Sequence, residues 1–203
     1  MERVAFFIDG FNLYHAIQEN PDYAKYKWLN LAALAKCYVQ KSQQVVKVFY
    51  FSAYATWDQQ KMSRHQTFVR ALQWAGVDII LGAFKFKERR CRICHKLYPT
   101  YEEKETDVNI AIKLFQTAIL DEYDTAIVVS GDSDLIPAVK AVKATFPAKK
   151  VGVVIPIGRS AEDLKKNCDF RFKMKEKHLA SCQFPDPVDL GGGHTLSRPA
   201  SWK

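Results

Sequence analysis

Short apolar runs alternate with helical patterns along most of the chain. Residues 4–8 form an uninterrupted apolar run that ends at Asp9-Gly10, which is typical of a strand buried in a parallel sheet, and we expect a loop directly after it. The pattern predicts further strands at residues 45–54, 77–81, 125–129, 151–155 and 170–172. It predicts helices at residues 29–39, 59–74, 105–120, 133–143 with a serine cap at Ser133, and 161–166. This alternation predicts an α/β fold, doubly wound, with a mainly parallel central sheet and helices on both faces.

The regular pattern ends near the C-terminus. After about Leu179 the chain is rich in Pro, Gly and Ser and includes Gly191-Gly192-Gly193. We therefore expect one domain over residues 1–178 and a tail over residues 179–203 that is extended or partly disordered. Trp202, close to the end, indicates docking of the tail onto the domain or onto a partner.

Composition narrows the class of protein. The chain has 203 residues, 48% of them hydrophobic, with 30 Lys plus Arg against 22 Asp plus Glu and a formal charge of +8. The longest stretch without a charged side chain, residues 48–57, has ten residues, whereas a membrane helix needs roughly 18 or more. We therefore expect no membrane span. Residues 1–9 lack the features of a signal peptide, so we expect a cytoplasmic protein.

Acidic residues follow two of the expected strands and begin one of the expected helices. Asp9 ends the first strand, Asp132 and Asp134 follow a later one, and Asp107 lies in the first turn of a helix. Because parallel strands present their carboxyl ends at one edge, these four carboxylates could converge there. Such a cluster repels itself unless protons or cations neutralise it, and Mg²⁺ or Mn²⁺ is the usual cation. Taken singly, each Asp is also typical of a turn or a helix start, but the combination favours a metal site.

Three segments carry these acids in motifs that resemble a known family. FIDGFN (residues 7–12), EKETDV (103–108) and VSGDSDL (129–135) are similar in order and spacing to the signatures of the NYN domain, LabA-like branch, within the PIN-like nuclease superfamily. The resemblance spans residues 3–178. It implies a Rossmann-like PIN fold and divalent-metal-dependent cleavage of RNA or, less often, DNA. Carried over by position, it implies four acidic metal ligands and one polar residue beside them: Asp9, Asp107, Asp132, Asp134 and Asn12.

The chemistry of phosphodiester hydrolysis agrees with a carboxylate cage. The reaction needs an activated water, an electrophile on the phosphate and a stabilised leaving oxygen, and bound metal ions supply all three. Ser130 and Ser133 could orient ligands or bind a phosphate, and Lys104 could offset charge. Capping or surface roles are the alternative for these three residues.

Two segments concentrate positive charge. Residues 85–96 contain six basic residues and one acidic residue, and residues 165–177 contain six basic and two acidic residues. Interleaved aromatic side chains could stack on unpaired bases while the cations contact phosphates, which favours a single-stranded nucleic acid as the partner. The family resemblance implies that this nucleic acid is RNA. The nucleic-acid-binding candidates are Lys85, Lys87, Arg89, Arg90, Arg92 and Lys96. The alternative is a solvated charged face, with the phenylalanines alternating as the core face of a strand.

Cys91 and Cys94 form a C-x-x-C pair, which in a reducing compartment indicates metal or redox chemistry rather than a structural disulfide. Attachment of a c-type haem is excluded because that chemistry belongs to exported proteins. One reading is half of a structural Zn²⁺ site, completed by His95, by His65 or Cys168, or by a second chain. A reduced thiol pair is the other.

The function that these features favour is a divalent-metal-dependent endoribonuclease acting on single-stranded RNA. One alternative is a nucleic-acid-binding regulatory or scaffold module of the same fold with little turnover. Another is a different Mg²⁺-dependent phosphoryl-transfer enzyme, such as a phosphatase. In aspartyl-phosphate phosphatases the D-x-D motif follows the first strand, whereas here it lies near residue 132. The sequence is compatible with a monomer or a homo-oligomer.

Overall fold

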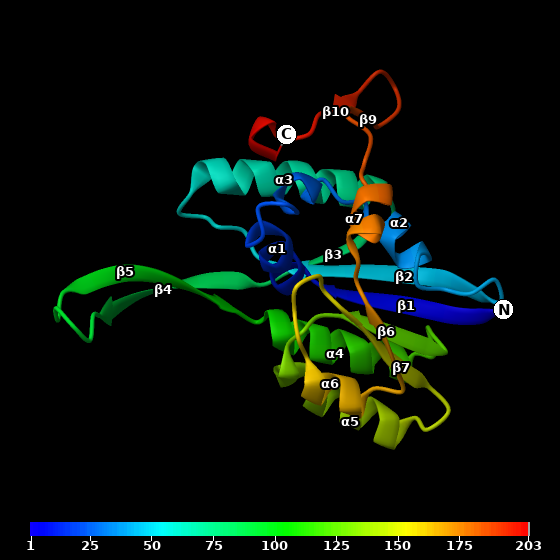
Figure 1. Ribbon diagram of the computed structural model, residues 1–203. Coiled ribbons are helices and arrows are strands. Elements are labelled where there is room, and N and C mark those ends of the chain that lie inside the picture. Colours follow the sequence, from blue (N-terminus) through cyan, green and yellow to red (C-terminus); the bar gives the residue numbers. More distant parts are fainter. Residues whose placement is uncertain (203) are drawn as a thin grey trace.

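The structure, a computed structural model, describes residues 1–202 and is built around one six-stranded sheet (Figure 1). The strands run in the order β3-β2-β1-β6-β7-β8, and every pairing is parallel. Their bounds are β1 Glu2–Asp9, β2 Gln43–Ser52, β3 Asp78–Leu81, β6 Thr125–Val129, β7 Lys150–Ile155 and β8 Phe170–Lys173. The predicted α/β fold with a parallel central sheet is confirmed.

Helices cover both faces of this sheet (Figure 1). One face carries α1 Gly10–Gln18, α2 Leu31–Lys36, α3 Gln59–Trp74 and α7 Glu176–Ser181, and the other carries α4 Thr106–Ile119, α5 Ile136–Thr145 and α6 Glu162–Asn167. Side-chain alternation along β1 sends Phe6 and Ile8 into one core and Ala5 and Phe7 into the other. Within residues 1–202, no helix combines the length and apolar character needed to cross a bilayer.

The segment after β1 is a helix, so the expectation of a loop was wrong. Asp9 caps α1, because its carboxylate accepts the backbone N–H of Asn12 at 3.0 Å. The helix buries three apolar residues at helical spacing, Leu13, Ala16 and Ile17. Gly10 does not make a turn. It lets α1 approach β2, since a Cβ on Gly10 would lie 2.6 Å from the carbonyl oxygen of Phe51.

The helix expected at residues 133–143 also begins differently. Ser133–Leu135 form the 3₁₀ turn η2, and α5 starts at Ile136. The cap is Asp132 rather than Ser133, because the Asp132 carboxylate accepts the N–H of Asp134 at 2.9 Å. Asp132 has extended backbone angles just before the turn, which is the conformation in which an Asp side chain caps well.

Residues 83–104 form a two-stranded hairpin, which we call the arm, that projects away from the sheet (Figure 1). Strands β4 Ala83–Arg90 and β5 Leu97–Lys104 pair antiparallel along their whole length and form a sheet of their own. A strand was weighed here only as the alternative to a nucleic-acid contact, on the alternation of Phe84 and Phe86. Most side chains of both strands are exposed, so the apolar alternation that normally reveals a strand is confined to the base of the arm.

The C-terminal segment folds back onto the domain instead of extending from it. It contains a small hairpin of β9 Val188–Asp189 and β10 Thr195–Leu196, followed by the turn η3 Ala200–Trp202. The buried indole of Trp202 packs against Trp28 and Phe68, with ring centroids 6.4 Å and 5.7 Å apart. The docking that Trp202 indicated is therefore onto the domain. The apolar residues that attach this segment are separated by Pro and Gly at irregular intervals, so they give no periodic pattern in the sequence. The domain division at residue 178 remains a proposal.

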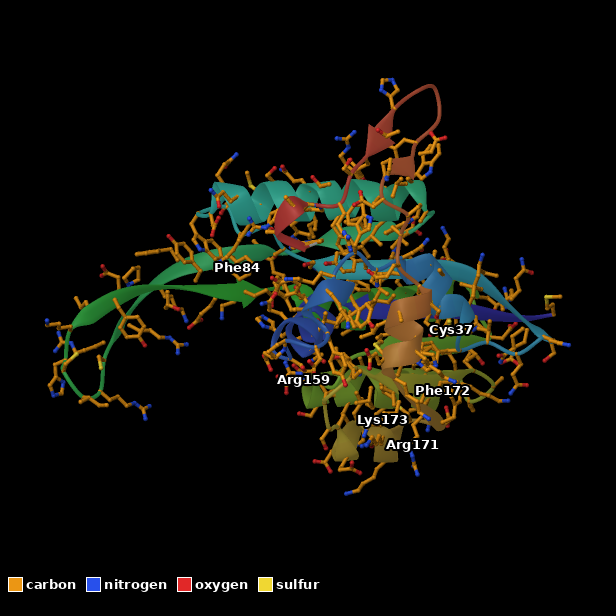
Figure 2. All side chains as sticks on the ribbon, turned by 45° about the horizontal axis from the view of Figure 1, so that its top comes forward. Cys37, Phe84, Arg159, Arg171, Phe172 and Lys173 are labelled. Atoms are coloured by element: carbon orange, nitrogen blue, oxygen red, sulfur yellow. The ribbon has the colours of Figure 1, made fainter. Side chains whose placement is uncertain are left out.

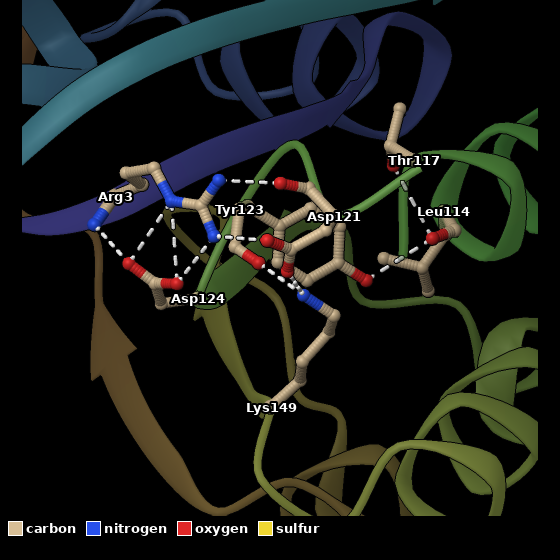
Figure 3. Close-up of polar contacts among 7 residues, drawn as sticks. All are labelled: Arg3, Leu114, Thr117, Asp121, Tyr123, Asp124 and Lys149. Atoms are coloured by element: carbon tan, nitrogen blue, oxygen red, sulfur yellow. Dashed lines mark hydrogen bonds and ion pairs between the residues drawn. The ribbon is translucent and has the colours of Figure 1, made fainter. Parts of the chain in front are cut away.

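The amino edge of the sheet is held by ion pairs (Figure 3). The Arg3 guanidinium contacts the carboxylates of Asp124 and Asp121 at 2.6 Å and 3.0 Å, and the Lys149 ammonium contacts Asp121 at 2.6 Å. Hydrogen bonds from Arg3 lower the pKa of Asp124 to about 2. Both aspartates at this edge therefore have cationic partners.

Candidate active site

The four predicted acidic residues lie at the opposite, carboxyl edge of the sheet. The chain passes from β1 to β2 and β3 on one side and from β6 to β7 and β8 on the other, so the strand order reverses between β1 and β6. Open α/β sheets bind ligands at such a reversal, beyond the carboxyl ends of the strands. Asp9 ends β1, Asp132 and Asp134 follow β6, and Asp107 lies in the first turn of α4.

Asp9 is the buried centre of a hydrogen-bond network. Only 4% of Asp9 is exposed, and burial raises the pKa of its carboxyl group. Hydrogen bonds oppose that rise, because the carboxylate accepts the Asn12 N–H and also the Ser130 hydroxyl at 2.9 Å. The Ser130 oxygen in turn accepts the N–H of Asp132 at 3.0 Å. Ser130 therefore orients Asp9 and joins β1 to the loop after β6.

Asn12 also holds this loop. Its side-chain oxygen accepts the N–H of Gly131 at 2.9 Å, which ties α1 to residues 130–134. A Cβ on Gly131 would lie 3.4 Å from that oxygen, so the loop fits closely against Asn12. The structure thus gives Asn12 a positioning contact beside the acidic residues.

The pKa of Asp107 is affected by the other carboxylates of the site. Its pKa is raised to about 6, first by burial and then by repulsion from neighbouring negative charges. In decreasing order of effect, these neighbours are Asp132, Asp9, Glu103 and Asp134. The four predicted aspartates therefore share one electrostatic environment.

Glu103 is an acidic neighbour to which the sequence analysis gave no role. Its carboxylate accepts the backbone N–H of Thr106 at 3.0 Å and also the Thr106 hydroxyl, so it caps the start of α4. In the sequence, a Glu three residues before a Thr that begins an apolar helix could have indicated this cap. Glu103 both fixes the helix that carries Asp107 and adds negative charge to the site.

No cation neutralises the four aspartates within residues 1–202. None of them forms an ion pair with Lys, Arg or His there, and Lys104 instead contacts Glu102 at 3.1 Å. Arg159, beside the loop at Gly131 (Figure 2), pairs with Glu19 at 2.9 Å.

The donor set of these four residues consists of carboxylate oxygens, which fit a hard divalent cation. Over the same described residues, no three His, Cys, Asp or Glu side chains converge closely enough to hold one metal ion. Coordination would therefore require the side chains to adjust.

The arm carries the first predicted basic segment. Lys87 and Arg89 both contact Glu102, the lysine at 2.7 Å, and together with Lys104 these cations lower the pKa of Glu102 to about 2. The remaining candidates are exposed and form no ion pair with the residues that the structure describes: Lys85, Arg90, Arg92 and Lys96.

Aromatic side chains occupy the other face of the arm near its base. The strand register pairs Phe84 with Glu103 and Phe86 with Tyr101, whereas Lys85, Lys87 and Arg89 point to the opposite face. Trp57 stacks on Tyr101 with ring centroids 3.8 Å apart and contacts Phe84 (Figure 2) at 4.6 Å. Phe84 and Tyr101 thus anchor the arm, while Phe86 stays exposed.

The second basic segment is distributed over α6, β8 and α7. Lys165 and Lys166 pair with acidic residues of their own helix, and β8 places Arg171, Phe172 and Lys173 along the edge of the sheet (Figure 2). It therefore does not form one surface with the arm.

Cys91 and Cys94 lie in the turn at the tip of the arm. The distant candidates for a zinc ligand are not brought there. His65 lies on α3, where its Nε2 is 3.2 Å from the Tyr50 hydroxyl, and Cys168 follows α6. All five cysteines are free thiols.

A cavity of about 620 Å³ adjoins the site between α1, the end of β2, α3 and η3. Its lining is mostly apolar and aromatic, including Tyr50, Phe68 and Trp202. Lys27 and Arg64 bring positive charge to it, and burial together with the charge of Arg64 lowers the pKa of Lys27. Neither Asp nor Glu is among the described lining residues.

Comparisons with known proteins bear on this site. The profile of the NYN domain matches residues 3–174. The chain is 26% identical to 6-hydroxy-3-succinoylpyridine 3-monooxygenase of Pseudomonas putida, over 98% of this chain and 75% of that protein. A crystal structure of a protein of unknown function from Vibrio parahaemolyticus superposes with a TM-score of 0.60 at 21% identity, covering 86% of this chain and 94% of the other. That last likeness concerns the fold alone.

Proposed function

The chain belongs to the NYN domain family of PIN-like nucleases, and on that premise we propose that it is a divalent-metal-dependent endoribonuclease acting on single-stranded RNA. One observation carries the proposal. Four aspartates from three segments share the switch point of the sheet without any cationic partner in residues 1–202. Asp107 has a raised pKa because of its neighbours, so a cation at this edge would relieve their repulsion.

Asp9, Asp107, Asp132 and Asp134 would hold Mg²⁺ or Mn²⁺. When bound, such an ion supplies an activated water and stabilises charge on the phosphate. The chain's own contribution is positional. Ser130 fixes the Asp9 carboxylate, and Asn12 fixes the loop that bears Asp132.

The arm would hold the nucleic acid. It starts at the carboxyl end of β3, the same edge of the sheet as the aspartates. Its four cations that form no ion pair with the described residues can contact phosphates, while exposed Phe86 can stack on an unpaired base. Stacking requires bases that are not paired, which favours a single strand.

One assay tests this proposal. Purified protein is incubated with internally labelled single-stranded RNA, single-stranded DNA and a generic phosphatase substrate, each with Mg²⁺, Mn²⁺ or EDTA. We expect internal cuts in the RNA with Mn²⁺ or Mg²⁺ and none with EDTA. Asp132→Asn should abolish cleavage, whereas the matched control Asp163→Asn, on the surface of α6, should cleave normally.

The alternatives give other outcomes in the same assay. RNA binding without cleavage in any metal would favour a scaffold module. Turnover of only the phosphatase substrate would favour a different phosphoryl-transfer enzyme. Full activity of Asp132→Asn, with contaminating nuclease excluded, would contradict the metal-site assignment.

The cavity favours a second candidate function, the binding and conversion of a small aromatic anion. Its aromatic lining suits a ring, and the neighbouring cations Lys27 and Arg64 suit an acidic substituent. The name of the Pseudomonas relative states that it acts on a substituted pyridine. Thermal unfolding with 6-hydroxy-3-succinoylpyridine tests this candidate. A rise in Tm that Arg64→Ala removes and Arg70→Ala retains would support it, and no rise would count against it.

A further inference from the structure

The turn at the tip of the arm, residues 91–96, is closed by backbone hydrogen bonds. The N–H of Cys91 donates to the carbonyl of Lys96 at 2.9 Å, and the N–H of His95 donates to the carbonyl of Cys91 at 3.0 Å. His95 has a φ of 56°, in the left-handed region that non-glycine residues seldom adopt. This conformation lets the chain reverse immediately after Cys94.

The Cys91 sulfur has hydrogen-bond partners within this turn. The backbone N–H groups of Ile93 and Cys94 donate to the Cys91 sulfur, and the Cys94 side chain also lies within hydrogen-bonding reach of it. Backbone donors aimed at a sulfur stabilise the thiolate, which is the form of cysteine that binds metals.

We propose that Cys91 and Cys94 form half of a structural zinc site, which a second copy of this chain completes with the same two cysteines. Structural zinc takes four ligands in a tetrahedron, and two thiolates from each chain supply them. Within residues 1–202 no third His, Cys, Asp or Glu converges with this pair, so the chain alone leaves the tetrahedron incomplete. A two-fold axis through the metal would supply the identical pair.

The surface around the tip suits a second copy. Ile93 is 93% exposed, and Leu97, Tyr98 and Phe86 are also exposed large apolar residues of the arm. The tip stands clear of the body (Figure 1), so two arms can meet without contact between their domains. The arms are basic and repel one another, but four thiolates around Zn²⁺ carry a net charge of −2 that offsets part of this repulsion. Each thiol releases its proton on binding.

The test uses the full chain, expressed without an affinity tag. Zinc is measured by elemental analysis, and the mass in solution by light scattering. We expect one zinc per two chains in a dimer, and a zinc-free monomer with an unchanged Tm for Cys91→Ser combined with Cys94→Ser. The control is Cys37→Ser combined with Cys182→Ser, which removes a thiol pair 3.4 Å apart in the body of the protein and should keep both zinc and dimer.

A second measurement uses only the wild-type protein, so that its result does not depend on whether the cysteine variants fold. Replacement of zinc by Co²⁺ should give the intense sulfur-to-metal absorption of four thiolates, at one Co²⁺ per two chains. A zinc-free wild-type protein, one zinc per monomer, or a dimer that persists in the Cys91→Ser, Cys94→Ser variant would each overturn the proposal. None of these readouts involves RNA, so they stand apart from the proposed nuclease activity.

Discussion

The two edges of the central sheet use aspartate in opposite ways. At the amino edge, Asp121 and Asp124 are bound by Arg3 and Lys149, and the pKa of Asp124 is lowered to about 2. At the carboxyl edge, no cation in residues 1–202 pairs with the four aspartates, and the pKa of Asp107 is raised to about 6. The first arrangement stabilises the folded protein, whereas the second costs stability.

This difference indicates a structural role for the aspartates at the amino edge and is consistent with the functional role proposed for those at the carboxyl edge. Neighbouring cations neutralise the aspartates at the amino edge, whereas within residues 1–202 those at the carboxyl edge form no ion pair. Hydrogen bonds from the Ser130 hydroxyl and the Asn12 N–H hold one of them, Asp9, in place. Proteins retain such unfavourable clusters where a ligand supplies the missing charge. The comparison therefore supports the proposal that a divalent cation binds at the carboxyl edge.

Among the residues that position the aspartates without being proposed ligands, the largest effect is expected at Ser130. Ser130→Ala removes the hydroxyl that donates to Asp9 and leaves the N–H of Asp132 without its acceptor. We expect metal-dependent RNA cleavage to fall about 10–100-fold, the usual effect of losing a group that orients a metal ligand. The matched control is Ser133→Ala, since Ser133 is exposed and its side chain makes none of these contacts. Equal activity of the two variants would show that Ser130 does not position the site.

Gly10→Ala tests the packing behind the carboxyl edge. A Cβ there would lie 2.6 Å from the Phe51 carbonyl and the Tyr50 ring, so α1 must shift. We expect the free energy of unfolding to drop by about 1–3 kcal/mol, with a Tm lower by about 2–4 °C per kcal/mol. Gly131→Ala, whose Cβ would meet the side chain of Asn12 at 3.4 Å, should cost less. A Gly10→Ala protein as stable as wild type would refute the close approach.

The arm should bind phosphates, and the amino edge should not. Replacing Lys85, Arg90 and Arg92 by Ala removes three cations that have no ion pair with the described residues. We expect the slope of log K against log salt for single-stranded RNA to decrease by about 2, at about 0.7 per lost contact. Lys149→Ala, a cation already held by Asp121, should leave this slope unchanged. An unchanged slope in the triple variant would place RNA elsewhere.

The smallest expected effect is on the pH dependence of stability, which should have opposite signs for Asp107 and Asp124. It is measured by thermal unfolding in EDTA. The folded pKa of Asp107 is about 6, above its ordinary value of 3.8, so its contribution to stability is present at low pH and is lost as the pH rises through 6. Asp107→Asn should therefore raise Tm by a degree or two at pH 8 and have no such effect at pH 3.

The contribution of Asp124 to stability depends on pH with the opposite sign. Its folded pKa of about 2 lies below 3.8, so its contribution is present at higher pH and is lost as the pH falls through 2. Asp124→Asn should lower Tm at pH 8. If both variants shift Tm in the same direction at pH 8, the contrast between the edges is wrong.

The sequence predicted most of the elements that bury apolar side chains, although it missed the helices α1 and α7. The apolar run of β1 and the helical stripe of α4 identified elements that the structure contains, because burial imposes a regular period. Most side chains of the arm are exposed, so its apolar period is short and confined to Phe84 and Phe86 near its base. A loop was expected after Asp9-Gly10, and the close approach of α1 to β2 at Gly10 could not be predicted, because Phe51 is distant in sequence.

The candidate site was predictable in part. Its four aspartates stand out in their motifs, and the topology places them at one edge. The contacts among Ser130, Asn12 and Asp9 depend on how α1 meets the loop after β6, and no local pattern encodes that. Glu103 was overlooked because a helix cap and a site charge look alike in sequence.

Titration of the metal-free protein with Mn²⁺, followed by electron paramagnetic resonance, tests the central claim most directly. The Cys91→Ser, Cys94→Ser background keeps the arm tip from taking up metal. We predict saturable binding that Asp132→Asn weakens about tenfold or more, while Asp121→Asn at the amino edge leaves it unchanged. Absent binding, or equal affinity in the Asp132→Asn protein, would contradict the assignment of the carboxyl edge as a metal site.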